Sequence, residues 1–215
     1  MNADWIAATL GETHPNANGS QTVMTRKLIA NLLQADELAL IAQTWSKIVF
    51  VDGKSTAGKK AARVKANEQA SRDDPSAKAL KGLVTDALRQ NSDFMQLTRA
   101  GRVSPLILSR YTAGMEYGRH IDDAVMYPGG QEFRIDFSFT VFLSAPDTYD
   151  GGELILEDET GGTAIKADAG TVFVYPSGVP HRVARITKGE RRAAVGWVES
   201  AKPRSLSAWR QAFKR

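Results

Sequence analysis

The chain contains no cysteine among its 215 residues. This absence excludes disulfides, thiolate zinc sites, thiolate-held iron–sulfur clusters and a cysteine nucleophile. Histidine is scarce too, with three residues, so any metal site must use very few imidazoles. No hydrophobic run approaches the roughly 18 residues of a membrane-spanning helix. The N-terminus lacks the basic and hydrophobic regions of a secretory signal, so we expect a cytoplasmic protein with no membrane partner.

The overall composition is that of a globular protein. Hydrophobic residues make up 42% and charged residues 24% of the chain, which excludes wholesale disorder. The length favours a single domain. The net charge of +4 is compatible with an anionic partner, such as nucleic acid, an acidic lipid surface or a carboxylated small molecule, but it is too small to choose among them.

The first part of the chain predicts helices. Residues 28–33 could form a short buried strand, whereas residues 35–48 and 75–90 carry apolar side chains at helical spacing. Asp36 and Asp74 are the expected N-caps of the two helices. The second of them is followed by a proline, which suits the first helical turn.

The second part of the chain predicts strands. From Pro105 onward the hydrophobic period changes to two, and residues 132–144 alternate over the length of one long strand. Five shorter strand-like runs follow, separated by turn residues. The sequence therefore predicts a mainly β protein with flanking α-helices, built as a sandwich or jelly roll.

The basic segment 52–72 contains a GxxxxGK pattern made by Gly53, Gly58 and Lys59. A phosphate-binding P-loop requires Ser or Thr next, but Lys60 occupies that position, and no strand with a Walker-type carboxylate follows. We therefore reject a P-loop. The segment looks too polar to be buried in a core, and we expect a flap that closes over a site. A solvated loop without a role is the alternative.

Three residues form a candidate metal site. His120 and Asp122 are two positions apart, so in an extended strand both side chains lie on one face. His181 begins a later strand-like run, which a jelly roll can bring close. Two histidines and one carboxylate form the facial triad suited to non-haem Fe(II), with open positions for a co-substrate and O2. The alternative is two ordinary strand histidines and a surface carboxylate.

Arg191 is a candidate anion-binding residue. It follows His181 by ten positions, and a hairpin could return it to the same interior. A dicarboxylate that chelates iron with one end would present its other carboxylate for bidentate pairing with a guanidinium. The alternative is a surface ion pair with Glu190 or Glu199.

Several stretches resemble a known family. RYTAGMEYGRHIDDA, DTYDGGELILED and GTVFVYPSGVPHRVARITKGERRAAVGWVES are similar to the iron- and 2-oxoglutarate-dependent dioxygenases, specifically the bacterial PKHD-type hydroxylases, relatives of prolyl hydroxylases. The similarity continues upstream through DGKSTAG and VKANEQ. It implies one domain over 26–200, with helical support and an active-site loop in 26–100 and a double-stranded β-helix core in 101–200. Residues 1–25 are then an N-terminal extension, and residues 201–215 a C-terminal tail.

The resemblance also implies roles for individual residues. It places His120, Asp122 and His181 on iron, and Arg191 on the C5 carboxylate of 2-oxoglutarate. Tyr111 matches a position that also contacts this carboxylate, with a core aromatic as the alternative. Three residues are expected to face the substrate: Tyr117, Lys65 and Asn67.

The implied activity is hydroxylation of an unidentified small molecule, amino acid or peptide by O2, with release of succinate and CO2. The implied cofactors are Fe(2+), 2-oxoglutarate and L-ascorbate. The intact carboxylate of Asp122 favours hydroxylation over halogenation. Two alternatives stay open: a nucleic-acid-modifying dioxygenase, against which the few aromatic residues in the basic stretches argue, and a non-catalytic, cupin-like metal-binding barrel.

Overall fold

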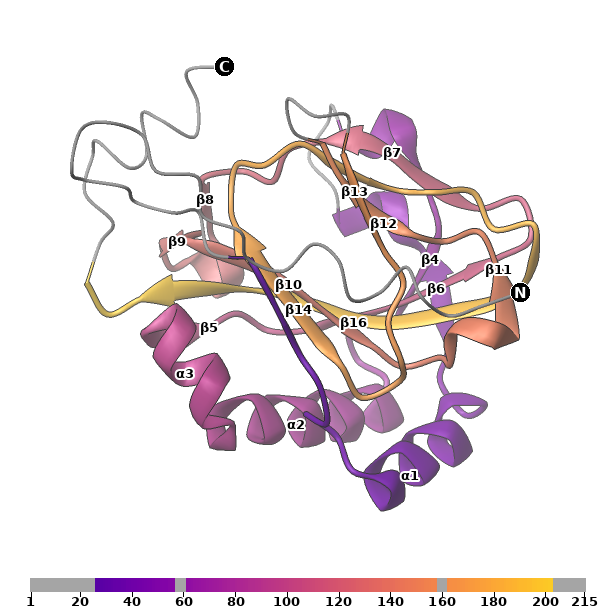
Figure 1. Cartoon of the computed structure of the whole chain (residues 1–215), viewed down its shortest axis with the longest axis horizontal. Helices are drawn as coiled ribbons and strands as arrows, with labels where there is room; N and C mark the ends of the chain where they lie inside the picture. The colour runs from indigo at the N-terminus through magenta and orange to yellow at the C-terminus, as the bar shows by residue number, and fades with distance from the viewer. Residues whose placement is uncertain (1–25, 57–60, 158–161, 203–215) are drawn as a thin grey trace.

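The computed structural model describes residues 26–56, 61–157 and 162–202 of the chain. Two antiparallel sheets form its centre, and three helices lie together on one side of the larger sheet (Figure 1). The prediction of a mainly β fold with flanking helices and a jelly-roll core is confirmed. The N-terminal extension, Gly58, Lys59 and the tail from residue 203 onward lie outside the described residues.

The larger sheet has nine strands. Its main path runs through β1 (Lys27–Ile29), β14 (Val172–Pro176), β10 (Phe137–Phe142), β16 (Lys188–Ser200), β6 (Ile107–Thr112), β4 (Glu68–Ala70) and β2 (Phe50–Asp52). Two further strands pair with β16: β5 (Ala100–Val103) and β11 (Tyr149–Asp150).

The smaller sheet has five strands. It runs through β13 (Thr163–Ile165), β12 (Leu154–Leu156), β15 (His181–Val183), β7 (Glu116–His120) and β3 (Lys65–Ala66). A separate hairpin joins β8 (Val125–Met126) to β9 (Phe133–Arg134). Short 3₁₀ turns complete the elements: η1 (Gly53–Thr56), η2 (Ala61–Val64), η3 (Pro128–Gly130) and η4 (Pro146–Thr148).

The helices are α1 (Ala35–Trp45), α2 (Pro75–Gln90) and α3 (Ser92–Thr98). The predicted helix 75–90 and its cap are confirmed, because Asp74 Oδ1 accepts the backbone N–H of Ala77 at 2.8 Å. The N-cap predicted for the first helix is wrong, since Gln34 occupies that position and its N–H donates to Glu37 Oε2 at 2.8 Å. The sequence pattern did not predict helix α3. None of the helices in the described ranges has the length and apolar content of a membrane span.

Two strand predictions need correction. The strand expected at 28–33 ends at Ile29, and the chain turns at Asn31, whose φ is 55°. The single strand expected at 132–144 is divided into β9 and β10, because the chain leaves the hairpin at Ile135 and joins the larger sheet. The bend is fixed by Asp136, a buried carboxylate that pairs with Arg134 and accepts the backbone N–H of Ser200 at 2.8 Å.

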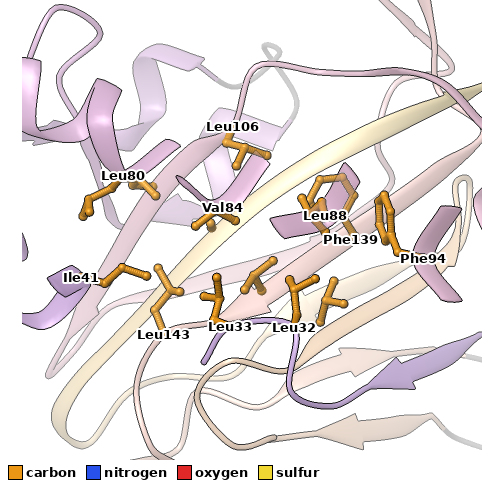
Figure 2. Packing of buried hydrophobic residues seen from close by; sticks show 14 of the residues in the cluster. Leu32, Leu33, Ile41, Leu80, Val84, Leu88, Phe94, Leu106, Phe139 and Leu143 are labelled. Atoms are coloured by element: carbon orange, nitrogen blue, oxygen red, sulfur yellow. The ribbon is translucent and has the colours of Figure 1, made fainter. Parts of the chain in front are cut away.

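The main hydrophobic core lies between the helices and the larger sheet (Figure 2). Leu80, Val84 and Leu88 on α2 are 0–2% exposed, and their spacing places them on one face of the helix. They pack in the same cluster as Leu106 and Phe139 from the sheet. The helices thus cover one face of the larger sheet, and its other face is turned toward the smaller sheet.

The expectation that segment 52–72 is too polar for burial is wrong. Lys65, Asn67 and Gln69 are 5%, 4% and 3% exposed, whereas Ala66 between them is exposed and Glu68 is half-buried. β3 pairs with β7 of the smaller sheet, whereas β4 pairs with β6 of the larger sheet. This stretch therefore crosses from one sheet to the other. A flap stays a prediction only for residues 53–64, of which 57–60 lie outside the described residues.

We expect Leu88→Ala to lower the free energy of unfolding by about 2–5 kcal/mol, because it removes buried methyl groups and leaves a cavity under the sheet. Urea denaturation followed by circular dichroism measures this. Leu40→Ala on α1 is the control, since Leu40 is 47% exposed and should change stability by no more than about 0.5 kcal/mol. Equal losses in both variants would contradict this location of the core.

Candidate metal centre

The two sheet histidines face each other across one strand pair. β7 and β15 run antiparallel, with His120 opposite His181. Asp122 follows two residues after the end of β7, so it lies beyond the strand in which we had expected it. His120 Nε2 is 3.9 Å from Asp122 Oδ1, and His181 Nε2 is 3.9 Å from Asp122 Oδ2. The ligand atoms of all three residues lie within 4.8 Å of one another.

Backbone carbonyls orient both imidazole rings. His120 Nδ1 lies 2.9 Å from the oxygen of Gly118, and His181 Nδ1 lies 2.9 Å from the oxygen of Val179. Because a carbonyl only accepts, each Nδ1 carries a proton, and the Nε2 of each ring lies on the side of the carboxylate. Burial, together with the neighbouring charge of His181, lowers the pKa of His120 to about 4. His120 is therefore neutral near pH 7, as a metal ligand must be.

The carboxylate of Asp122 is held by two residues of the larger sheet. Its Oδ2 accepts from Ser138 Oγ at 2.7 Å and from Trp197 Nε1 at 2.9 Å. Ser138 and Trp197 are direct neighbours across β10 and β16. Burial alone would raise the pKa of Asp122, but the charge of His181 and these two hydrogen bonds outweigh it and lower the pKa.

Sequence reasoning missed both hydrogen-bond donors. The alternation of residues 132–144 did separate Ser138 from the apolar face of the predicted strand. No spacing signal, however, links Ser138 or Trp197 to a carboxylate, which approaches from the end of a strand in the other sheet.

Arg191 lies in the larger sheet, opposite Tyr111 on β6. The hairpin that we had expected after His181 is wrong, because β15 and β16 belong to different sheets. Arg191 is 2% exposed, and its Nε and Nη2 have no hydrogen-bond partner within the described residues. The two carboxylates considered as alternatives are engaged elsewhere: Glu190 pairs with Arg192, and Glu199 with Arg102.

One cavity of about 710 Å³ lies between the two sheets. Residues of both sheets line it, and all eight candidate site residues are among them: His120, Asp122, His181, Arg191, Tyr111, Tyr117, Lys65 and Asn67. The ring of Tyr117 stacks on that of His120 with a centroid separation of 3.7 Å, and Lys65 Nζ lies 5.1 Å from the Tyr117 centroid. Burial lowers the pKa of Lys65 to about 8, against the opposing charges of Asp122 and Asp52.

The sequence matches the family model of the 2OG-Fe(II) oxygenase superfamily over residues 106–199. A PKHD-type hydroxylase of Parvibaculum lavamentivorans is 46% identical over 175 residues, which are 80% of this chain and 77% of the relative. One of Synechococcus elongatus is 44% identical over 169 residues, or 79% and 76% of the two chains. The chain belongs to the PKHD-type hydroxylases. The non-catalytic barrel is thereby excluded, and the hydroxylase is a 2-oxoglutarate-dependent dioxygenase.

Solved structures share the fold of this PKHD-type hydroxylase. A prolyl-4-hydroxylase of Pseudomonas putida superposes with a TM-score of 0.60 at 19% identity, over 82% of this chain and 94% of that chain. A prolyl hydroxylase of Trichoplax adhaerens, in complex with a peptide fragment, gives a TM-score of 0.60 at 19% identity, over 86% and 88%. HygX of Streptomyces hygroscopicus, with nickel and 2-oxoglutarate, gives 0.55 at 13% identity, over 82% and 83%.

The donor set of the hydroxylase fits an Fe(II) ion. Two imidazole nitrogens and one carboxylate are the ligands that non-haem iron takes in a facial arrangement. Their ligand atoms lie within 4.8 Å of one another, and a hydrogen bond to another part of the chain orients each of the three side chains. The buried guanidinium of Arg191 in the same cavity fits the free carboxylate of a dicarboxylic co-substrate.

We expect Trp197→Phe to weaken Mn²⁺ binding about 10- to 100-fold, because the ring is kept while the donor that orients Asp122 is lost. Competition with a fluorescent chelator measures the dissociation constant. Trp45→Phe is the matched control, since Trp45 Nε1 is buried without a hydrogen-bond partner in the described part of the chain. Unchanged affinity in Trp197→Phe would show that the hydrogen bond does not position the carboxylate.

Proposed function

We propose that this hydroxylase uses O2 and 2-oxoglutarate to hydroxylate a small molecule, an amino acid or a peptide, with release of succinate and CO2. One observation carries the proposal. The ligand atoms of His120, Asp122 and His181 converge within 4.8 Å in a cavity that Arg191 also lines, with two buried guanidinium nitrogens unpaired in the described structure.

His120, Asp122 and His181 would hold the iron. When bound, Fe(II) would supply the redox chemistry that activates O2, the oxidant, for attack on a C–H bond. The residues of the chain contribute position and electrostatics. Ser138 and Trp197 fix the Asp122 carboxylate on one oxygen, and this leaves Oδ1 to face the metal position.

Arg191 and Tyr111 would bind the co-substrate. A buried guanidinium requires a counter-charge, because an unpaired ion in a low-dielectric interior is costly. The two oxygens of a carboxylate can accept two parallel hydrogen bonds from the planar guanidinium. Burial raises the pKa of Tyr111, so its hydroxyl stays protonated and can donate to an anion. These two residues would fix which end of 2-oxoglutarate points away from the metal.

The metal end of the cavity would receive the substrate, with Lys65 and Tyr117 facing it. Val64 and Ile121 also line the cavity and are 41% and 43% exposed, so they lie where the cavity meets solvent. The same fold admits both a peptide and a small molecule. The Trichoplax prolyl hydroxylase binds a peptide fragment, and HygX, at a TM-score of 0.53, binds hygromycin B.

Replacement of either His120 or His181 by Ala should abolish metal-dependent turnover, because two remaining ligands hold iron weakly and in the wrong place. The measurements are metal content and succinate release from 2-oxoglutarate across a panel of amino acids, peptides and siderophore-like compounds. Assays with and without L-ascorbate test the remaining cofactor prediction. Full activity in either variant would refute the metal assignment.

Arg191→Leu should weaken apparent 2-oxoglutarate affinity by about 2–5 kcal/mol, because a buried carboxylate loses its charged partner. Iron binding should stay nearly intact. The measurement is the KM for 2-oxoglutarate beside the dissociation constant for Mn²⁺. Arg192→Leu is the control, since the neighbouring side chain pairs with Glu190 and does not line the cavity. Loss of metal with an unchanged KM would instead give Arg191 a structural role.

A further inference from the structure

Asn67 is a buried amide that the proposed roles leave unexplained. It is 4% exposed and lines the cavity, and both its Nδ2 and its Oδ1 lack a hydrogen-bond partner among the described residues. Leaving a buried polar group without a hydrogen-bond partner destabilises a folded protein. A site that keeps such a group in the wall of its cavity is suited to a ligand that satisfies it.

Asn67 lies near Arg191 and Tyr111, at the end of the cavity where we propose that the co-substrate binds. Glu68 on β4 lies opposite Arg110 on β6, so Asn67, the residue before Glu68, lies at the level of Tyr111, which is itself opposite Arg191 on β16. The guanidinium carbon of Arg191 lies 5.4 Å from the centroid of the Tyr111 ring. Lys65, two positions earlier on the same face, lies instead over Tyr117 at the metal end.

Gly53 secures the position of Asn67. Its N–H donates to the backbone oxygen of Asn67 at 2.9 Å, and a Cβ built on Gly53 would lie 2.0 Å from Asn67 Oδ1. Only glycine leaves room for this amide. The presence of glycine at the first position of the GxxxxGK pattern is thus explained without phosphate binding, because it lets Asn67 pack into the cavity wall.

We propose that Asn67 binds the co-substrate together with Arg191 and Tyr111, and that it does not face the primary substrate as the sequence had led us to expect. Its amide donates to a carboxylate oxygen of the dicarboxylate. This inference rests on the proposed function, because it requires 2-oxoglutarate at the Arg191 end of the cavity. Asn67 and Lys65, two residues apart where the chain crosses between the sheets, then serve the co-substrate and the substrate respectively.

The test is equilibrium binding of 2-oxoglutarate to the anaerobic, Mn²⁺-loaded protein, measured by calorimetry. Asn67→Ala should raise the dissociation constant about 10-fold, the usual effect of losing one hydrogen bond to a charged group. Asn67→Asp keeps the shape but sets a carboxylate against a carboxylate, so it should raise the constant about 100-fold. Ala66→Ser, at the outward-facing neighbour, is the control and should change nothing.

Two further measurements separate binding from packing. The Mn²⁺ affinity should be unchanged in each variant, and Gly53→Ala, which displaces the amide without removing it, should also weaken 2-oxoglutarate binding. Wild-type affinity for 2-oxoglutarate in Asn67→Asp would overturn the inference, because it would leave Asn67 a space-filling role. If Arg191→Leu also bound 2-oxoglutarate as the wild type does, the proposed function itself would fail.

Discussion

The architecture depends on one constraint: the central strands of the larger sheet are buried on both faces. Because side chains alternate along a strand, β16 sends Ala194 and Val198 into the helix-facing core and Arg191 and Trp197 into the cavity. The core holds the strand rigidly from behind. The groups on its other face are thereby fixed for binding, as a precise site requires.

The second feature that organises the molecule is the way in which neighbouring groups stabilise the charged side chains buried in the cavity. Asp122 is nearly enclosed, yet its pKa is lowered, because Ser138, Trp197 and the neighbouring histidines stabilise the carboxylate. Arg191 is enclosed without comparable hydrogen bonds in the described structure. Buried charges without partners are costly, and this supports the proposal that the cavity takes a cation at the triad and an anion at the guanidinium.

The segment at residues 65–70 shows why a polar stretch need not be a surface loop. Its sequence suggested solvent exposure, since it is rich in charged and amide side chains. In the fold, β3 and β4 belong to different sheets, and Lys65, Asn67 and Gln69 form the wall between them. The composition predicted exposure wrongly, because these residues face a polar cavity inside the protein. A pattern of apolar and polar residues does not distinguish a polar side chain that faces such a cavity from one that faces solvent.

The sequence by itself determined the fold class, the helix at 75–90 and the candidate site residues, because hydrophobic period, capping chemistry and the resemblance to one family are all local in the chain. Only the tertiary structure decided which sheet carries each residue. That step placed Arg191 opposite Tyr111 rather than in a hairpin, and it brought Ser138 and Trp197 to Asp122. These pairs are distant in sequence, and their contact depends on how two sheets pack, which no local pattern encodes.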